Sequence, residues 1–199
     1  MTSAPDAPPA EGGSDATDSP VTFISVDVET AGPNPADYAM LSIGACLASD
    51  PDVGFYVEIK PTSDAVQPAA LAVSGLSMDD LARDGVEPAE AMAWFEAWLA
   101  EVTPPGRKPL MVGFNSPFDW MFVADYFGRF LGRNPFGHSA LDIKSFYMGM
   151  TGVPWSGTSM KHLAPIYLAG RELSHNALSD ARDQAELFRR LLAEATDND

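Results

Sequence analysis

The distribution of apolar and polar residues along the chain predicts five β-strands. Residues 21–28, 40–48 and 54–59 are largely apolar, and turn-forming residues separate them at 31–35 and 49–52. Apolar runs with such breaks are typical of an antiparallel meander. Two shorter apolar runs, residues 110–114 and 140–143, follow later in the chain and are predicted to extend the sheet.

Between and after these strands, apolar residues recur at helical spacing. A short helix is predicted near 69–76, and a second begins at Ser77, with Asp80 at the capping-box position. Further helices are predicted over 88–102, 117–131, 145–150 and 177–195. A helix after Ser159 is expected to break or kink near Pro165, because proline lacks an amide hydrogen. The core stripe of the 88–102 helix is predicted to comprise Ala91, Trp94, Phe95, Trp98, Leu99 and Val102. The pattern predicts an α/β fold, a mixed five-stranded sheet with helices on both faces.

Composition changes sharply at the ends of this pattern. Residues 1–20 are dominated by Ala, Pro, Gly, Ser, Thr and Asp, too few apolar groups to order a chain, so a disordered acidic head is predicted. One domain is expected over residues 21–195, with a tail at 196–199. The first residues lack the basic start and apolar block of a signal peptide, and Cys46 is the only cysteine. We therefore expect a soluble protein of the reducing cytoplasm.

The chain is strongly acidic, with a formal net charge of −16 and a pI of about 4.3. Proteins that coat duplex DNA or lie on a membrane surface need basic patches, so the charge disfavours both functions. A short substrate held mainly through a metal ion is compatible with it.

Acidic residues lie at three places in the predicted fold where a carboxylate requires a structural or functional explanation. Asp27 and Glu29 end the first strand and project from the same side of it, and no Lys or Arg lies in that run to relieve their repulsion. A divalent cation would relieve it, although a strand ending in a solvated acidic turn explains the pair as well. Asp119 and Asp180 each begin a predicted helix, where the helix dipole alone favours an acid, and His175 precedes the last helix.

Taken in order, these residues form a motif. Asp27-x-Glu29-Thr30, then Asn115-x-x-Phe118-Asp119, then His175-x-Ala177-x-x-Asp180 resemble the signature of the DEDDh family of 3′ to 5′ exonucleases. The resemblance also covers residues 74–81 and 140–142 and spans about residues 23–192. One departure is Ala31, which stands between Thr30 and Gly32 where the family usually has Thr-Gly, and it affects the local loop shape.

The resemblance implies a ribonuclease-H-like fold and a two-metal site. Asp27, Glu29, Asp119 and Asp180 would hold two Mg²⁺ or Mn²⁺ ions, which prefer oxygen ligands, and His175 would be the general base. His175 and Asp180 are five positions apart, an offset of about 140° on a helix, so His175 is expected in the loop before the helix. The implied reaction releases nucleoside 5′-monophosphates from the 3′ ends of single-stranded or short RNA or DNA.

Residues near the motifs are candidates for substrate contacts, and two alternative functions are also compatible with the sequence. The candidates for substrate binding near the motifs are Thr30, Leu76, Met78, Asn115, Phe118 and Trp155. Lys161 and Arg171 are candidate phosphate contacts, Asp142 is interpreted as structural, and Asp183 as a solvated helix position. The choice between RNA and DNA stays open, as does a homodimer. The alternative functions are a catalytically idle module that holds a nucleic-acid end or a protein partner, and an acidic cation-binding protein.

Overall fold

The computed structural model describes residues 20–171 and 174–197. The head predicted at 1–20 lies outside the described residues except for Pro20, and of the predicted tail only residues 196 and 197 are described. Five strands form one sheet in the order β3-β2-β1-β4-β5. They are β1 (Val21–Thr30), β2 (Met40–Leu47), β3 (Gly54–Glu58), β4 (Lys108–Gly113) and β5 (Ala140–Asp142). All five predicted strands are therefore confirmed, with boundaries that differ by a few residues.

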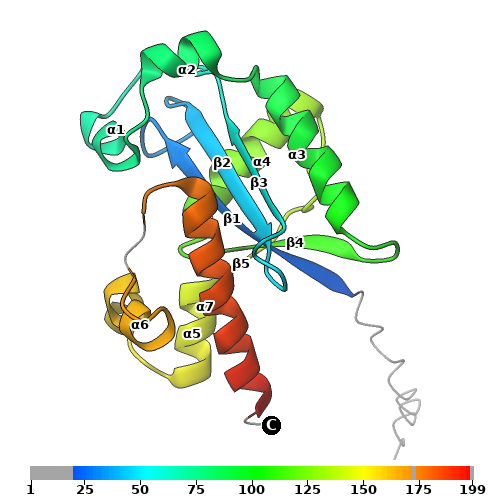
Figure 1. The fold of residues 1–199 in the computed structure, drawn as a ribbon, viewed down its shortest axis with the longest axis vertical. Coiled ribbons are helices and arrows are strands. Elements are labelled where there is room, and N and C mark those ends of the chain that lie inside the picture. The colour runs from blue at the N-terminus through cyan, green and yellow to red at the C-terminus, as the bar shows by residue number, and fades with distance from the viewer. Residues whose placement is uncertain (1–19, 172–173, 198–199) are drawn as a thin grey trace, which may run out of the picture.

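The sheet is mixed, as expected. The first three strands pair antiparallel, whereas β1 pairs with β4, and β4 with β5, in parallel. The described helices are α1 (Pro68–Ser74), α2 (Met78–Asp84), α3 (Pro88–Val102), α4 (Pro117–Leu131), α5 (Ile143–Thr151), the 3-10 helix η1 (Trp155–Thr158), α6 (Met160–Tyr167) and α7 (Ala177–Asp197). β1 is the central strand, because two strands lie on each side of it. Its carboxyl end therefore lies in the middle of the sheet (Figure 1).

Helices cover both faces of the sheet and divide the core into two main clusters. Ile24, Val26 and Val28 of β1 pack with side chains of α3 and α4 in one cluster. The second cluster combines side chains of α5, α6 and α7, and α7 crosses the strands β1 and β2 (Figure 1). Since alternate residues of a strand face opposite sides, the residues between the three aliphatic ones face α7.

One expectation about the core needs correction. Trp94, assigned to the core stripe of α3, is 48% exposed, because the helix turns that position away from the sheet. The helix α6 ends at Tyr167, two residues after Pro165, close to where a break was expected. Trp155 is the first residue of the 3-10 helix η1. Among the described residues, no helix combines the length and the apolar composition that crossing a lipid bilayer requires.

Candidate active site

The carboxyl end of β1 supplies two acids on the face covered by α7. Asp27 pairs in register with Gly44 of β2, and Glu29 pairs with Ser42. Val26 and Val28, on either side of Asp27, are buried in the opposite cluster. The alternation of the strand thus directs Asp27 and Glu29 to one side, as the sequence predicted.

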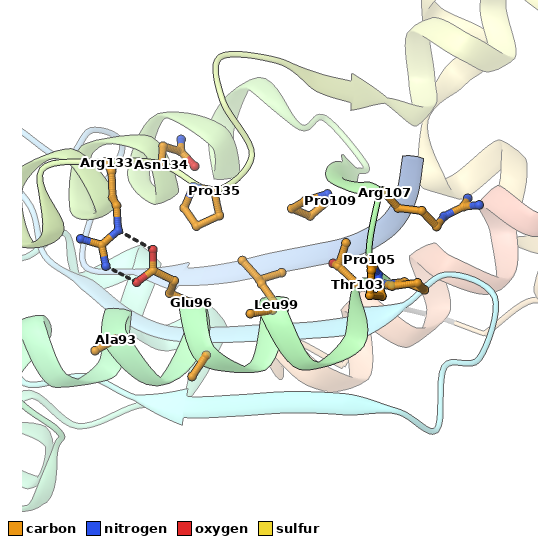
Figure 2. Close-up of a pocket in the computed structure, with 14 residues that line it drawn as sticks. Ala93, Glu96, Leu99, Thr103, Pro105, Arg107, Pro109, Arg133, Asn134 and Pro135 are labelled. Atoms are coloured by element: carbon orange, nitrogen blue, oxygen red, sulfur yellow. Dashed lines mark hydrogen bonds and ion pairs between the residues drawn. The ribbon is translucent and has the colours of Figure 1, made fainter. Parts of the chain in front are cut away.

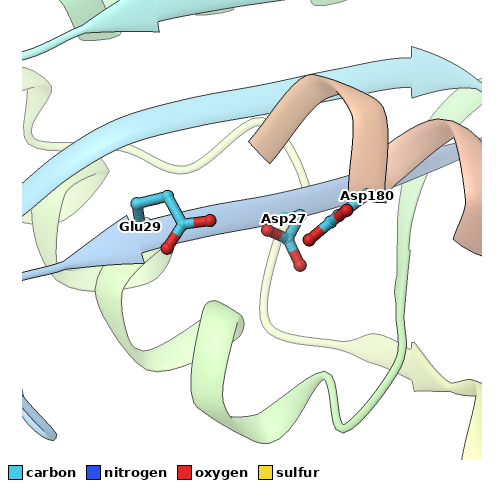
Figure 3. Close-up of side chains that lie close together, drawn as sticks. All are labelled: Asp27, Glu29 and Asp180. Atoms are coloured by element: carbon cyan, nitrogen blue, oxygen red, sulfur yellow. The ribbon is translucent and has the colours of Figure 1, made fainter. Parts of the chain in front are cut away.

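A close approach of α7 to β2 brings a third acid to this pair. A Cβ atom on Gly44 would lie 2.1 Å from both the carbonyl carbon of Ala177 and the amide nitrogen of Leu178. The first turn of α7 therefore rests directly on β2, beside Asp27. Carboxylate oxygens of Asp27, Glu29 and Asp180 lie within 4.8 Å of one another (Figure 3).

Asp119 lies next to these three acids without joining their closest group. It is buried in the first turn of α4, and its Oδ1 accepts a hydrogen bond from the main-chain nitrogen of Val28 at 3.1 Å. Val28 stands between Asp27 and Glu29, so this bond fixes the start of α4 against the acidic end of β1. The four acids named in the sequence thus converge from three distant segments.

Burial makes the negative charge of this group costly. Burial raises the pKa of Asp27 well above its usual value, and the neighbouring Asp119, Glu29 and Asp180 raise it further. Burial likewise raises the pKa of Glu29 to about 7, with Asp180 and Asp119 adding to the effect. Burial also raises the pKa of Asp119 to about 7, against the hydrogen bond from Val28 that lowers it. Among residues 20–171 and 174–197, no Lys, Arg or His forms an ion pair with these four acids.

His175 lies in the loop before α7, where it was expected. Asp180 holds this loop: its Oδ1 accepts from the nitrogen and Oγ of Ser174, and its Oδ2 accepts from the nitrogen of His175 at 3.0 Å. His175 itself has a φ of 56°, in the left-handed region that few residues other than glycine adopt. Its imidazole lines a hollow of about 670 Å³, together with Lys161 and Arg171.

Sequence reasoning missed Gln184, which contacts the acids directly. Gln184 is 1% exposed, its Nε2 donates to Asp27 Oδ1 at 2.7 Å, and its Oε1 accepts from the nitrogen of Phe114 at 2.9 Å. Its position four residues after Asp180 could have identified it, because residues four apart lie on the same face of a helix. Asp183 was also misjudged: it is buried and pairs with Arg171 at 2.7 Å, so it is no solvated position.

Asp142 has the structural role that was predicted for it. Asp142 caps the start of α5, because its Oδ1 accepts hydrogen bonds from the nitrogen and Oγ of Ser145. Its Oδ2 accepts a hydrogen bond from the nitrogen of Ser116 at 3.0 Å. These bonds fix the turn between β4 and α4, which precedes Asp119.

The candidate substrate residues fall into three settings. Leu76 and Met78 pack with Ala31 and Leu41 beside the end of β1. Trp155 is 52% exposed, and the Nζ of Lys144 lies 4.3 Å from the centre of its ring. The other three candidates lie close to the acids along the chain. Thr30 is buried and donates to Gly32 O, Asn115 has a φ of 66°, and the partly buried ring of Phe118 contacts Phe122.

A second hollow, of about 680 Å³, lies between α3 and the loops that follow α3 and α4 (Figure 2). Arg133 pairs with Glu96 at its edge, and Pro105 and Pro135 form part of its wall. None of its lining residues is a candidate site residue.

Comparison with known proteins gives consistent results. The family model RNase T, described as exonuclease, matches residues 24–188. The 3′–5′ DNA exonuclease Cap18 of Escherichia coli is 47% identical over 167 residues, which cover 84% of this chain and 89% of that protein. Ribonuclease T of Salmonella typhimurium is 31% identical over 176 residues, covering 83% of this chain and 81% of that protein.

Solved structures of exonucleases share the fold. The nuclease domain of 3′hExo, a DEDDh family member bound to rAMP, has a TM-score of 0.66 at 16% identity and covers 91% of this chain and 95% of that one. Exonuclease I of E. coli, in complex with a dA16 oligonucleotide, has a TM-score of 0.69 at 20% identity and covers 89% of this chain and 42% of that one. The predicted ribonuclease-H-like α/β fold is confirmed.

Proposed function

We propose that this chain degrades single-stranded DNA from its 3′ end with two divalent cations and releases nucleoside 5′-monophosphates. The chain belongs to the RNase T family of exonucleases and is a 3′ to 5′ exonuclease. The observation that carries the proposal is the convergence of Asp27, Glu29 and Asp180 within 4.8 Å, with Asp119 beside them. The preference for DNA over RNA is drawn from the E. coli relative, which is named as a DNA exonuclease.

The donor set of the site fits Mg²⁺ or Mn²⁺. Four carboxylates offer oxygen ligands, which these hard cations prefer, and Cys46 lies buried with its thiol directed to Ala181 O. Burial raises the pKa values of Asp27, Glu29 and Asp119, and repulsion from neighbouring acids of the site raises the pKa values of Asp27 and Glu29 further. These four carboxylates would hold the divalent ions, which would supply neutralisation of the charge that develops on the scissile phosphate.

His175 is the proposed proton acceptor for the attacking water. Its side chain is exposed and faces a hollow, while its main-chain nitrogen is bound to Asp180. This bond fixes the backbone of His175 beside Asp180, and the exposed imidazole can turn toward the reacting water. Histidine suits this role because it exchanges protons near neutral pH.

A single strand would reach the acids past two features of the surface. The exposed ring of Trp155 offers a stacking surface for a base, and Lys144 beside it offers a positive charge for a phosphate. The hollow next to His175 carries Lys161, which would contact a phosphate further along the strand, whereas Arg171 in the same hollow pairs with Asp183 and Glu186. These contacts are few, in keeping with a strongly acidic protein that acts on strand ends rather than along a duplex.

The test is digestion of a 5′-labelled single-stranded oligonucleotide with and without Mg²⁺ or Mn²⁺. We expect metal-dependent shortening from the 3′ end, with mononucleotide products, and faster digestion of deoxyribo- than of ribo-oligomers. Asp27→Asn should abolish shortening, whereas the matched control Asp50→Asn should not, because Asp50 is an exposed acid in the turn after β2, at the opposite end of that strand. Oligonucleotide binding without any shortening would contradict the proposal and favour an idle binding module.

A further inference from the structure

We propose that Gln184 is a positioning residue of the acidic site, whose side-chain amide occupies Asp27 Oδ1 and so directs Asp27 Oδ2 toward a divalent cation. The inference rests on the proposed function, because it assigns a role to Gln184 in the same metal site. Gln184 itself is too deeply buried to contact a substrate.

The hydrogen bonds fix the orientation of the amide. The main-chain nitrogen of Phe114 can only donate, so the atom of Gln184 that it contacts must be the carbonyl oxygen Oε1. Nε2 then faces Asp27 Oδ1 at 2.7 Å as a donor. Oδ1 of Asp27 is thereby engaged by the amide. Oδ2 is therefore the oxygen that remains for a cation shared with Glu29 and Asp180, whose carboxylates lie within 4.8 Å of that of Asp27.

A neutral donor is the chemically suitable choice at this position. A buried Lys or Arg would pair with Asp27 and take the place of the cation, whereas an apolar residue would leave Oδ1 buried without a partner. The amide satisfies Oδ1 and adds no positive charge. The attraction of the carboxylates for a divalent ion is therefore kept.

Gln184 also links the three segments that carry the acids. From α7 it reaches β1 through Asp27 and the end of β4 through Phe114. Phe114 is followed by the turn that leads to Asp119, and Asp119 in turn accepts from Val28 of β1. Hydrogen bonds to Gln184 and Asp119 thus join α7, β1 and the segment after β4 around Asp27.

The experiment compares the wild type with Gln184→Met, which keeps the side-chain length and removes both hydrogen bonds. We measure the Mn²⁺ concentration that gives half-maximal digestion, and the rise in Tm on adding Mn²⁺ without substrate. Groups that orient a metal ligand change metal affinity by about 10–100-fold. We therefore expect at least a tenfold higher half-saturating Mn²⁺ and a smaller metal-induced rise in Tm, with KM for the oligonucleotide unchanged at saturating metal.

Leu191→Ala is the matched control, because Leu191 is fully buried on the same helix and packs away from the acids. It should lower Tm without changing the half-saturating Mn²⁺. If Gln184→Met does not fold, Gln184→Asn replaces it, since the shorter amide cannot reach both partners. An unchanged metal dependence in an active Gln184 variant overturns the inference, whereas a wild type without metal-dependent digestion overturns the proposed function itself.

Discussion

Replacing Gly44 by alanine should separate α7 from the sheet and disable the acidic site. The added Cβ would lie 2.1 Å from the backbone of Ala177 and Leu178, and ordinary contact begins at 3.4 Å. Because backbone atoms cannot turn aside as a flexible side chain can, the first turn of α7 must retreat by about 1.3 Å, the difference between these two distances. Asp180 and His175 would move with it.

The variant should lose both activity and stability. A displacement of about 1 Å in a catalytic group lowers the rate by roughly 10²-fold. Forcing one extra methyl group into a packed core destabilises a protein by about 1–3 kcal/mol. We therefore expect Gly44→Ala to remain folded and to lose at least about 10²-fold in kcat for oligonucleotide digestion.

The assay pairs digestion rates with thermal unfolding, and the chain offers a matched control. Gly128, on the exposed side of α4, has nothing within 4 Å of an added Cβ. Gly128→Ala should leave kcat unchanged and stabilise the protein by up to about 1 kcal/mol, since alanine favours a helix. Full activity in a folded Gly44→Ala variant would refute the argument that close packing at Gly44 sets the position of Asp180.

Three further predictions follow from the site. Burial raises the pKa of Glu29 and Asp119 to about 7, so the metal-free folded state holds protons that the unfolded state releases at lower pH. Its free energy of unfolding should therefore fall from about pH 4 to about pH 7, by roughly 1–3 kcal/mol after allowance for the partial exposure of Glu29, and Mn²⁺ should restore it. Urea unfolding measures this, and an equally steep fall in Asp119→Asn would count against it. His175→Ala should lower single-turnover rates by about 10²–10⁴-fold while the Mn²⁺-induced rise in Tm persists, and a loss of that rise would argue for a structural role. Trp155→Ala should raise KM for the oligonucleotide about tenfold with kcat little changed, because one stacked base contributes about 1–3 kcal/mol; an unchanged KM would exclude Trp155 from binding.

The amino-acid sequence alone determined most of the fold and the identity of the acids. Apolar periodicity is a local property, so it located all five strands and the long helices α3, α4 and α7. The alternation of a strand is local too, and it placed Asp27 and Glu29 on one side of β1. Asp119, Asp180 and His175 were found by their order along the chain, and the structure brings them to the same end of the sheet.

Only the tertiary structure decided how these acids are held. Gln184 contacts Asp27 across 157 positions of sequence, and Gly44 fits beneath α7 because the two backbones nearly touch there. Neither contact leaves a periodic signal, since a glutamine on a helix and a glycine in a strand occur for many local reasons. Likewise, the sequence pattern predicted a solvated helix position for Asp183, whereas the tertiary structure pairs it with Arg171. Long-range contacts depend on which surfaces the chain brings together, and that is settled only when the helices pack against the sheet.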